Sequence, residues 1–206
     1  DAQVDSTLGF LNSLTGTVPR RGDQKIFFPK FDWNITGNNT LTVSYNRVRW
    51  ASPAGIQTQA TNTRGRASFG DDFVKIDALN IRLASTLSPT LINEARFQWA
   101  RDNEFQNSQP PLPGEPTTGM GGRSPDVFLT NGIEFGKPTF LERAAFPDEK
   151  RWQFADTITL TAGNHTLKWG GDINYVKDLQ SNLFQEGGAY SYSNINDFIV
   201  DYVNFT

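Results

Sequence analysis

Residues 31–50 read FDWNITGNNTLTVSYNRVRW, and this stretch decides the fold. Phe31, Trp33 and Ile35 alternate with polar residues, and after a Gly-Asn-Asn turn the alternation resumes from Leu41. A period of two places successive side chains on opposite faces, so two such runs joined by a turn predict a β-hairpin. The apolar face of this hairpin must contact either a protein core or lipid.

The same pattern recurs twice more along the chain. We expect hairpins over about 24–50, 72–104 and 150–178, and short helices over 6–14 and 194–204. The tight turns fall at one end of the strands, whereas long Gly- and Pro-rich connections fall at the other, which is typical of transmembrane barrels. The sequence therefore predicts an all-β fold: an antiparallel up-and-down meander of long hairpins, part of a transmembrane β-barrel, with long loops on one side.

Three regions follow from this pattern. Residues 1–23 are expected to form a leading loop with a short helix, and 181–206 a trailing loop with a second one. Residues 24–180 are expected to form a six-stranded barrel segment, interrupted by loops 51–71 and 105–149. Loops this long are uncommon in compact domains unless they are functional or disordered.

Composition narrows the class of function. The chain has 206 residues and a net charge of −3, with both signs interspersed and no basic run longer than Arg20-Arg21, so we expect no nucleic-acid partner. No run of about 18 apolar residues predicts a membrane-spanning helix. With one histidine and no cysteine, the sequence can form neither a zinc cluster nor a thiol nucleophile. We therefore expect no cofactor, no metal site and no enzymatic activity.

Aromatic residues make up 13% of the chain, and several lie within or at the ends of the expected strands. Amphipathic rings gather where a membrane meets water, because one edge of the ring can stay hydrated. The alternative is that these rings form the core of a soluble β-sandwich. The predicted membrane-interface aromatics are Trp33, Trp50, Trp99, Trp152, Trp169 and Tyr175.

Three charged residues interrupt the apolar face. Lys75 and Asp77 share parity with Leu79, and Asp156 lies within the fifth expected strand. For the third strand, either only residues 78–86 lie in the membrane, or a bulge changes the parity; Asp156 raises the same question.

Several motifs resemble one family of membrane proteins. FPKFDWNITGNNTLTVSYNR (28–47), SPTLINEARFQWARD (88–102) and FADTITLTAGNHTLKWGGDI (154–173) are similar to barrel segments of TonB-dependent outer-membrane receptors. The closest type is the large form with an N-terminal carboxypeptidase-regulatory-like domain. The resemblance implies a bacterial outer-membrane location, TonB as a partner, and uptake of a bulky nutrient such as a siderophore or an oligosaccharide.

Barrels of that family have about 22 strands, so six strands resemble a section from the first third of one. In lipid, unpaired edges of a sheet cost several kcal/mol per backbone group. We therefore expect partners at both edges, either the remainder of the barrel or further copies of the chain, in addition to outer-membrane lipid. Edge pairing between copies would instead give a structural or adhesive fibre at the cell surface.

Ligand contacts are expected in the long loops, where arginines and aromatics suit sugars or anionic compounds. These candidate residues are Arg64, Arg66, Arg123, Phe128, Phe135 and Phe140.

Overall fold

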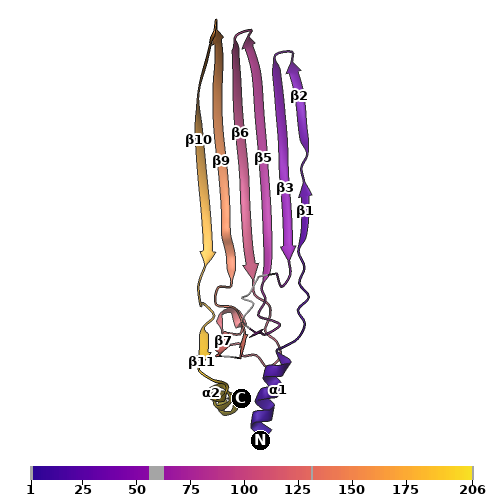
Figure 1. Ribbon diagram of the computed structural model, residues 1–206, viewed down its shortest axis with the longest axis vertical. Helices are drawn as coiled ribbons and strands as arrows, with labels where there is room; N and C mark the ends of the chain where they lie inside the picture. Colours follow the sequence, from indigo (N-terminus) through magenta and orange to yellow (C-terminus); the bar gives the residue numbers. More distant parts are fainter. Residues whose placement is uncertain (1, 56–62, 131, 206) are drawn as a thin grey trace.

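The computed structural model describes residues 2–55, 63–130 and 132–205 of the chain. Long antiparallel strands form an elongated sheet, and a smaller mixed unit lies at one end of it (Figure 1). Part of the predicted loop 51–71, residues 56–62, lies outside the described residues.

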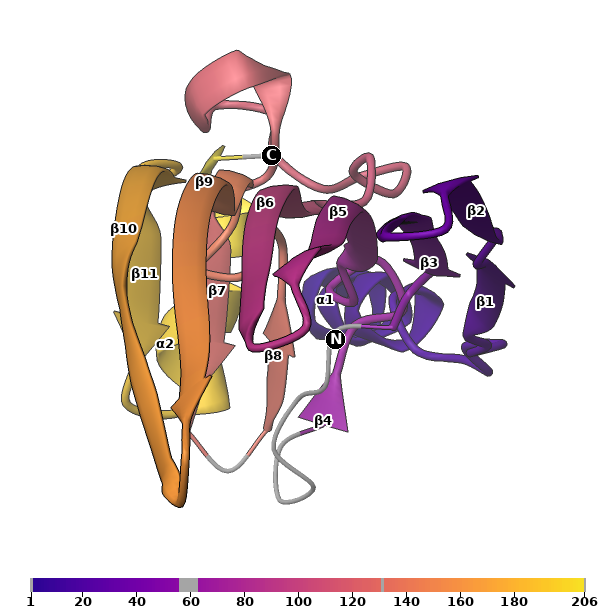
Figure 2. The same ribbon diagram turned by 90° about the horizontal axis from the view of Figure 1, so that it is seen from above.

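The elongated sheet has seven strands, joined only by antiparallel pairs. Its order is β1-β3-β5-β6-β9-β10, with β2 also beside β3. Seen from above, the strands stand in an open row from β10 to β1 and β2 (Figure 2). The strands are β1 (Asp23–Phe27), β2 (Lys30–Thr36), β3 (Asn39–Ser52), β5 (Asp71–Ser88), β6 (Leu91–Asn107), β9 (Arg143–Ala162) and β10 (His165–Asn182).

The predicted meander of long hairpins is confirmed, and β1 and β2 together fill a single position beside β3. The break between them contains Pro29, which has no N–H to donate to a neighbouring strand. Its carbonyl still accepts a hydrogen bond from the Tyr45 N–H at 3.0 Å, so the two short strands continue one line. The tight turns between β2 and β3, β5 and β6, and β9 and β10 all lie at the end remote from the smaller unit (Figure 1).

The smaller unit, called the loop subdomain below, comes from segments expected to be loops. Its four-stranded sheet has the order β11-β7-β8-β4 and contains both parallel and antiparallel pairs. The predicted loop 105–149 contains regular structure: β6 continues to Asn107, β9 begins at Arg143, and two short strands lie between them. The elements are α1 (Ala2–Ser13), β4 (Thr63–Arg64), the 3-10 helix η1 (Met120–Gly122), β7 (Asp126–Leu129), β8 (Ile133–Phe135), β11 (Ala189–Tyr192) and α2 (Ile195–Phe205).

Both predicted helices are confirmed. Asn194 caps α2, because its Oδ1 accepts hydrogen bonds from the backbone N–H groups of Asn196 (2.9 Å) and Asp197 (3.1 Å). Neither helix in the described part of the chain has the length and apolar character needed to cross a bilayer.

The conventional hydrophobic core lies in the loop subdomain and not in the long sheet. Leu14, Leu129 and Phe135 are almost completely buried there. In the sheet, by contrast, Phe154 is 57% exposed and Ile173 is 73% exposed. The sandwich alternative is therefore wrong for this sheet, because its large apolar side chains are not packed against a second layer.

Candidate functional site

One face of the sheet, called the outer face below, carries an apolar band that crosses β2, β3, β5, β6, β9 and β10. Register pairs the strands so that side chains of equal height form rows. One such row runs through Phe31, Val43, Ile81, Phe97, Phe154 and Ile173. The rings of Phe97 and Phe154 lie 4.8 Å apart between centroids. An unbroken apolar row on an exposed face marks a surface that is covered by something other than water.

The apolar part of the outer face is as tall as a membrane requires. On β9 it extends from Leu160 to Trp152, which is about 26 Å of strand at about 3.3 Å per residue. The usual tilt of barrel strands leaves roughly 20 Å, close to the apolar band of about 25 Å in outer-membrane barrels.

A row of amphipathic aromatics marks the lower edge of this band. Tyr45, Trp99, Trp152 and Tyr175 lie at one height on adjacent strands, with Leu79 among them. The rings of Trp152 and Tyr175 lie 5.7 Å apart between centroids. This is the arrangement expected of an interfacial girdle.

The predicted interface aromatics do not all lie at that height. Trp99, Trp152 and Tyr175 share the row, whereas Trp33 and Trp169 lie closer to the tight turns. Trp50 pairs with Val74 and has the opposite parity to Tyr45, so it lies on the other face near the loop subdomain. The interfacial role of these residues stays a prediction.

Directly beyond the aromatic row, the outer face becomes charged. This next row, called the boundary row below, contains Arg47, Asp77, Arg101, Lys150 and Lys177. The register of β3 against β5 is unbroken there, so no bulge changes the parity of Lys75 or Asp77. The membrane part of β5 is therefore the segment from about residue 78, and Asp77 instead accepts hydrogen bonds from Arg49 (2.7 Å) and the Tyr45 hydroxyl (2.5 Å).

Asp156 places a carboxylate on the outer face, within the apolar band. The register of β6 against β9 keeps it on the outer face, beside Ala95 and Gly171. The Asn93 side-chain amide donates a hydrogen bond to it at 2.5 Å. Gly171 adds no side chain, and the space above it is open.

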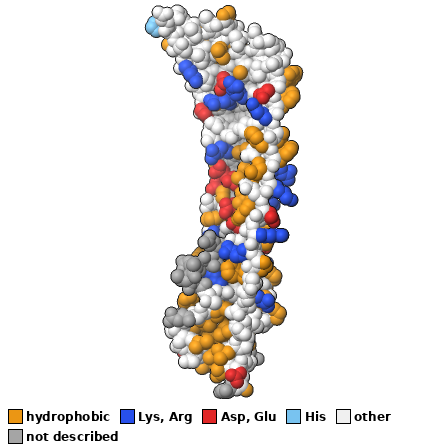
Figure 3. Space-filling model, turned by 45° about the vertical axis from the view of Figure 1, so that its right-hand side comes forward, with side chains coloured by type: hydrophobic (Ala, Val, Ile, Leu, Met, Phe, Trp, Pro, Cys, Tyr) orange, Lys and Arg blue, Asp and Glu red, His pale blue; other side chains and the backbone are white. Residues whose placement is uncertain are grey.

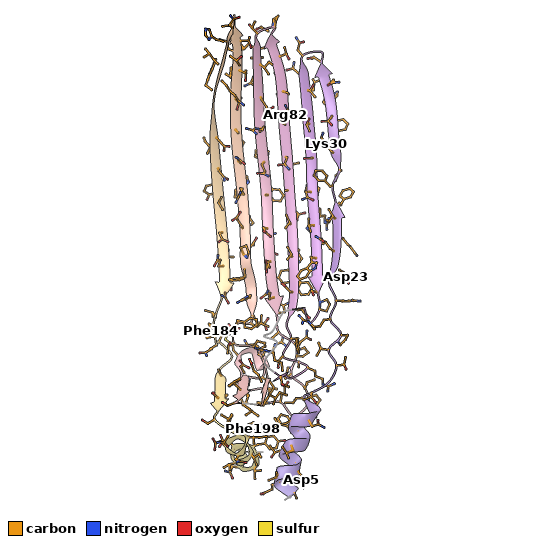
Figure 4. All side chains as sticks on the ribbon, in the orientation of Figure 1. Asp5, Asp23, Lys30, Arg82, Phe184 and Phe198 are labelled. Carbon is orange, nitrogen blue, oxygen red and sulfur yellow. The ribbon has the colours of Figure 1, made fainter. Side chains whose placement is uncertain are left out.

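The inner face is polar and carries paired charges near the tight turns. Arg82 donates to Glu94 (2.6 Å), and Arg96 lies 3.6 Å from the same carboxylate. Lys30 pairs with Asp32 at 3.0 Å. Charged side chains gather in this part of the molecule (Figure 3), and Lys30 and Arg82 lie in the half nearest the turns (Figure 4).

A hollow of about 370 Å³ lies on this face. Its walls come from β3, β5, β6 and β9 and combine the hydroxyl, amide and guanidinium groups of the inner face with the sheet backbone between them. A wet or protein-filled lumen tolerates such groups, whereas lipid does not. The lining residues are Thr42, Ser44, Asn80, Ile81, Arg82, Arg96, Phe97, Gln98, Gln153 and Ala155.

The loop subdomain contains a larger hollow of about 680 Å³, called the aromatic cavity below. Its walls come from α1, β7, β8, β11, α2 and the connection around residues 114–118. Phe10 and Tyr202 stack with centroids 5.0 Å apart, and Phe198 contacts Tyr192 edge to face at 5.3 Å. The lining residues are Phe10, Gly114, Pro116, Thr118, Pro125, Val127, Phe135, Tyr190, Tyr192, Phe198, Asp201 and Tyr202.

A buried charged group supports the floor of the loop subdomain. Arg64 Nη1 lies 2.8 Å from Glu134 Oε1, and both side chains are about nine-tenths buried. Burial and the neighbouring Glu134 carboxylate raise the pKa of Asp126 from 3.8 to about 7. Asp126 is thus a carboxyl group that carries its proton close to neutral pH.

The six residues predicted to bind a ligand are not brought together. Arg64 is buried against Glu134, and Phe135 is buried in the core, where its edge lines the aromatic cavity. Arg123 lies 4.0 Å from Glu142, and Phe140 lies under the guanidinium of Arg143.

The remaining two are separate as well. Phe128 is exposed on β7, and Arg66 lines a shallow hollow beside Pro53. Ligand binding by this set stays a prediction. In residues 2–55, 63–130 and 132–205, no three His, Asp or Glu side chains gather as a metal site would require.

The aromatic cavity was missed by sequence reasoning, although two signals point to it. Tyr190 and Tyr192 alternate along a short strand, and Phe198 and Tyr202 are four residues apart on one helix. Spacings of two on a strand and four on a helix place each pair on one face.

Taken together, the apolar outer face, the aromatic row and the polar inner face define a transmembrane β-barrel sheet. The chain belongs to the outer membrane beta barrel domain family, whose model matches residues 2–206. It is therefore a protein of the bacterial outer membrane, where its outer face contacts lipid and its sheet edges adjoin barrel neighbours. No curated protein and no solved structure gives a significant match.

Proposed function

We propose that the chain forms part of a TonB-dependent receptor that takes up a bulky nutrient, such as a siderophore or an oligosaccharide, across the outer membrane. The observation that carries the proposal is the division of the molecule into three zones along its length: tight turns, an apolar band, and a folded loop subdomain. Loops that fold into a structured unit with a sizeable cavity suit capture of a ligand before transport.

The inner face supports the same proposal. Paired charges such as Arg82–Glu94 and Lys30–Asp32 line the end nearest the turns, which is the periplasmic end in barrels of the usual orientation. A polar lumen can hold an internal plug that is displaced by an energy-coupling protein. The family resemblance supplies TonB as that protein, and binding and transport rather than catalysis as the activity.

The test is energised uptake by the full-length protein, expressed in a Gram-negative host with and without TonB. We expect radiolabelled nutrient to accumulate against its gradient only when TonB is present. Accumulation that continues unchanged without TonB, or that only equilibrates, would contradict the proposal.

A second candidate is a self-assembling surface protein, which is favoured by the two sheet edges at β1 and β2 and at β10. Copies paired through these edges would build a fibre. Extraction with detergent distinguishes the two candidate functions. A heat-modifiable monomer in detergent supports the receptor, whereas a sedimentable fibre that mild detergent does not dissolve supports the surface protein.

A further inference from the structure

The aromatic cavity combines a buried floor with an accessible wall. Phe198 is only 6% exposed, whereas Tyr190, on the strand that borders the opening, is 56% exposed. Phe10, Tyr202 and Phe198 form a continuous group of rings, with centroids 5.0 and 5.9 Å apart along it. The volume of about 680 Å³ lies within the range of sites for small molecules.

The connection around Gly114 passes close to one of the rings that line the cavity. Gly114 has φ +88°, a conformation that other residues rarely adopt, and an added Cβ would lie 3.2 Å from the ring of Phe10. Glycine at this position lets the connection approach the ring while leaving the space between the walls open.

The charged part of the cavity lining is negative. Among the described residues that line it, Asp201 is the only charged one, and neither Lys nor Arg is present. Burial raises the pKa of Tyr192, and so does the hydrogen bond that the Tyr192 hydroxyl donates to the Asp201 carboxylate. An anionic ligand would therefore meet a carboxylate with no compensating cation, which is unfavourable.

We propose that the aromatic cavity binds a neutral saccharide. This proposal rests on the proposed uptake function and names the class of nutrient that is taken up. The apolar C–H face of a sugar ring lies against the exposed ring of Tyr190, as flat apolar surfaces pack on aromatic rings. Hydroxyl groups at the edge of the sugar donate to the Asp201 carboxylate and exchange hydrogen bonds with the Tyr192 and Thr118 hydroxyls. Of the two nutrient classes named above, this chemistry favours the oligosaccharide over a siderophore whose iron chelate carries a negative charge.

Binding of three kinds of probe to the full-length protein in lipid nanodiscs tests the proposal. The probes are an array of neutral oligosaccharides, an array of uronic-acid oligosaccharides, and a ferric tricatecholate, which is an anionic siderophore chelate, and the strongest binder is then measured by calorimetry. We expect a neutral oligosaccharide to bind, and neither the uronic acids nor the anionic chelate to bind. The proposal is overturned if no neutral member of the array binds, or if an acidic probe binds in the cavity.

Three variants locate the site. We expect Tyr190→Ala and Asp201→Asn each to weaken binding of the neutral saccharide at least tenfold. Phe184→Ala is the matched control, because Phe184 is an exposed aromatic in the segment that leads into β11 and does not line the cavity, and we expect it to change the affinity less than twofold. Equal affinities in all three variants would overturn the proposal.

Far-ultraviolet and near-ultraviolet circular dichroism shows whether each variant is folded. Should Tyr190→Ala unfold the subdomain, Tyr190→Phe keeps the ring and is expected to bind within threefold of the original protein, while Asp201→Asn still tests the polar edge. Energised uptake of a ligand that does not enter the cavity overturns this inference alone. A saccharide that binds in the cavity but is accumulated without TonB overturns the uptake mechanism alone.

Discussion

Replacing Ile173 by arginine should destabilise the protein in a bilayer, whereas replacing its neighbour Asn174 should not. The two residues are adjacent on β10, and register places Ile173 opposite Phe154 on the outer face and Asn174 opposite Gln153 on the inner face. Ile173 is 73% exposed, so it makes few contacts with protein that the substitution would remove. The difference between the two variants therefore reports the environment of each face.

The magnitude follows from the depth of Ile173 in the apolar band. On β9 the band extends from Leu160 to Trp152, so its middle is level with Asp156, and the Ile173 row is one row away, about 7 Å along the strand. Arginine on the lipid face costs about 2–4 kcal/mol at the midplane and about 0–1 kcal/mol near the interface. Halfway between these depths we expect a loss of about 2 kcal/mol for Ile173→Arg, and a change of less than about 0.5 kcal/mol for Asn174→Arg.

The measurement is reversible unfolding in guanidinium chloride of the full-length protein folded into lipid vesicles. A loss of about 2 kcal/mol lowers the ratio of folded to unfolded protein roughly thirtyfold, well above the usual error of such titrations. Equal losses in both variants, or a larger loss for Asn174→Arg, would show that the outer face is not the one in contact with lipid.

Three further predictions use other parts of the structure. Removing the carboxylate from the apolar band with Asp156→Leu should raise the free energy of unfolding by about 1–2 kcal/mol in the same assay. Gly136 has φ +89°, and an added Cβ would lie 1.9 Å from the Pro125 carbonyl oxygen, so Gly136→Ala should open the loop subdomain and make its peptide bonds sensitive to brief proteolysis. Because the pKa of Asp126 is raised from 3.8 to about 7, its favourable contribution is present in full below pH 3.8 and is lost as the pH rises to about 7 and beyond. Native-state hydrogen exchange of the loop subdomain should therefore show stability falling by at most about 4 kcal/mol across this range, and Asp126→Asn should remove that pH dependence.

The long sheet was predictable because its signal is local. Alternation along FDWNITGNNTLTVSYN sets the faces of the first hairpin, and the tight turn fixes which strands are neighbours. The same reasoning holds for the pairs β5 with β6 and β9 with β10, where sequence neighbours are also neighbours in space. No contact between distant segments was needed to derive these pairs.

The loop subdomain was not predictable in this way. Its strands are two to four residues long, too short for a periodic pattern, and apart from β7 with β8 they pair across large gaps in the chain. Thr63 pairs with Ile133 and Asp126 with Ala189, both in parallel. This is why Phe135 was expected on a loop surface although it lies in a core, and why the residues of the aromatic cavity were not recognised as a group.

The depth of the membrane boundary on the outer face is recognised by comparing residues at the same height on neighbouring strands, and it cannot be read from one strand alone. On β5, Leu79 and Asp77 have the same parity, so alternation alone cannot say that one lies in lipid and the other in water. Register places Asp77 level with Arg47 on one side and Arg101 on the other, and every strand from β3 to β10 becomes charged at this same height. Five charged residues at one height cannot all be chance intrusions into lipid, since each would cost free energy there. The change from the aromatic row to the boundary row therefore fixes the depth at which the sheet leaves the bilayer, and it assigns the loop subdomain with its cavity to the aqueous side.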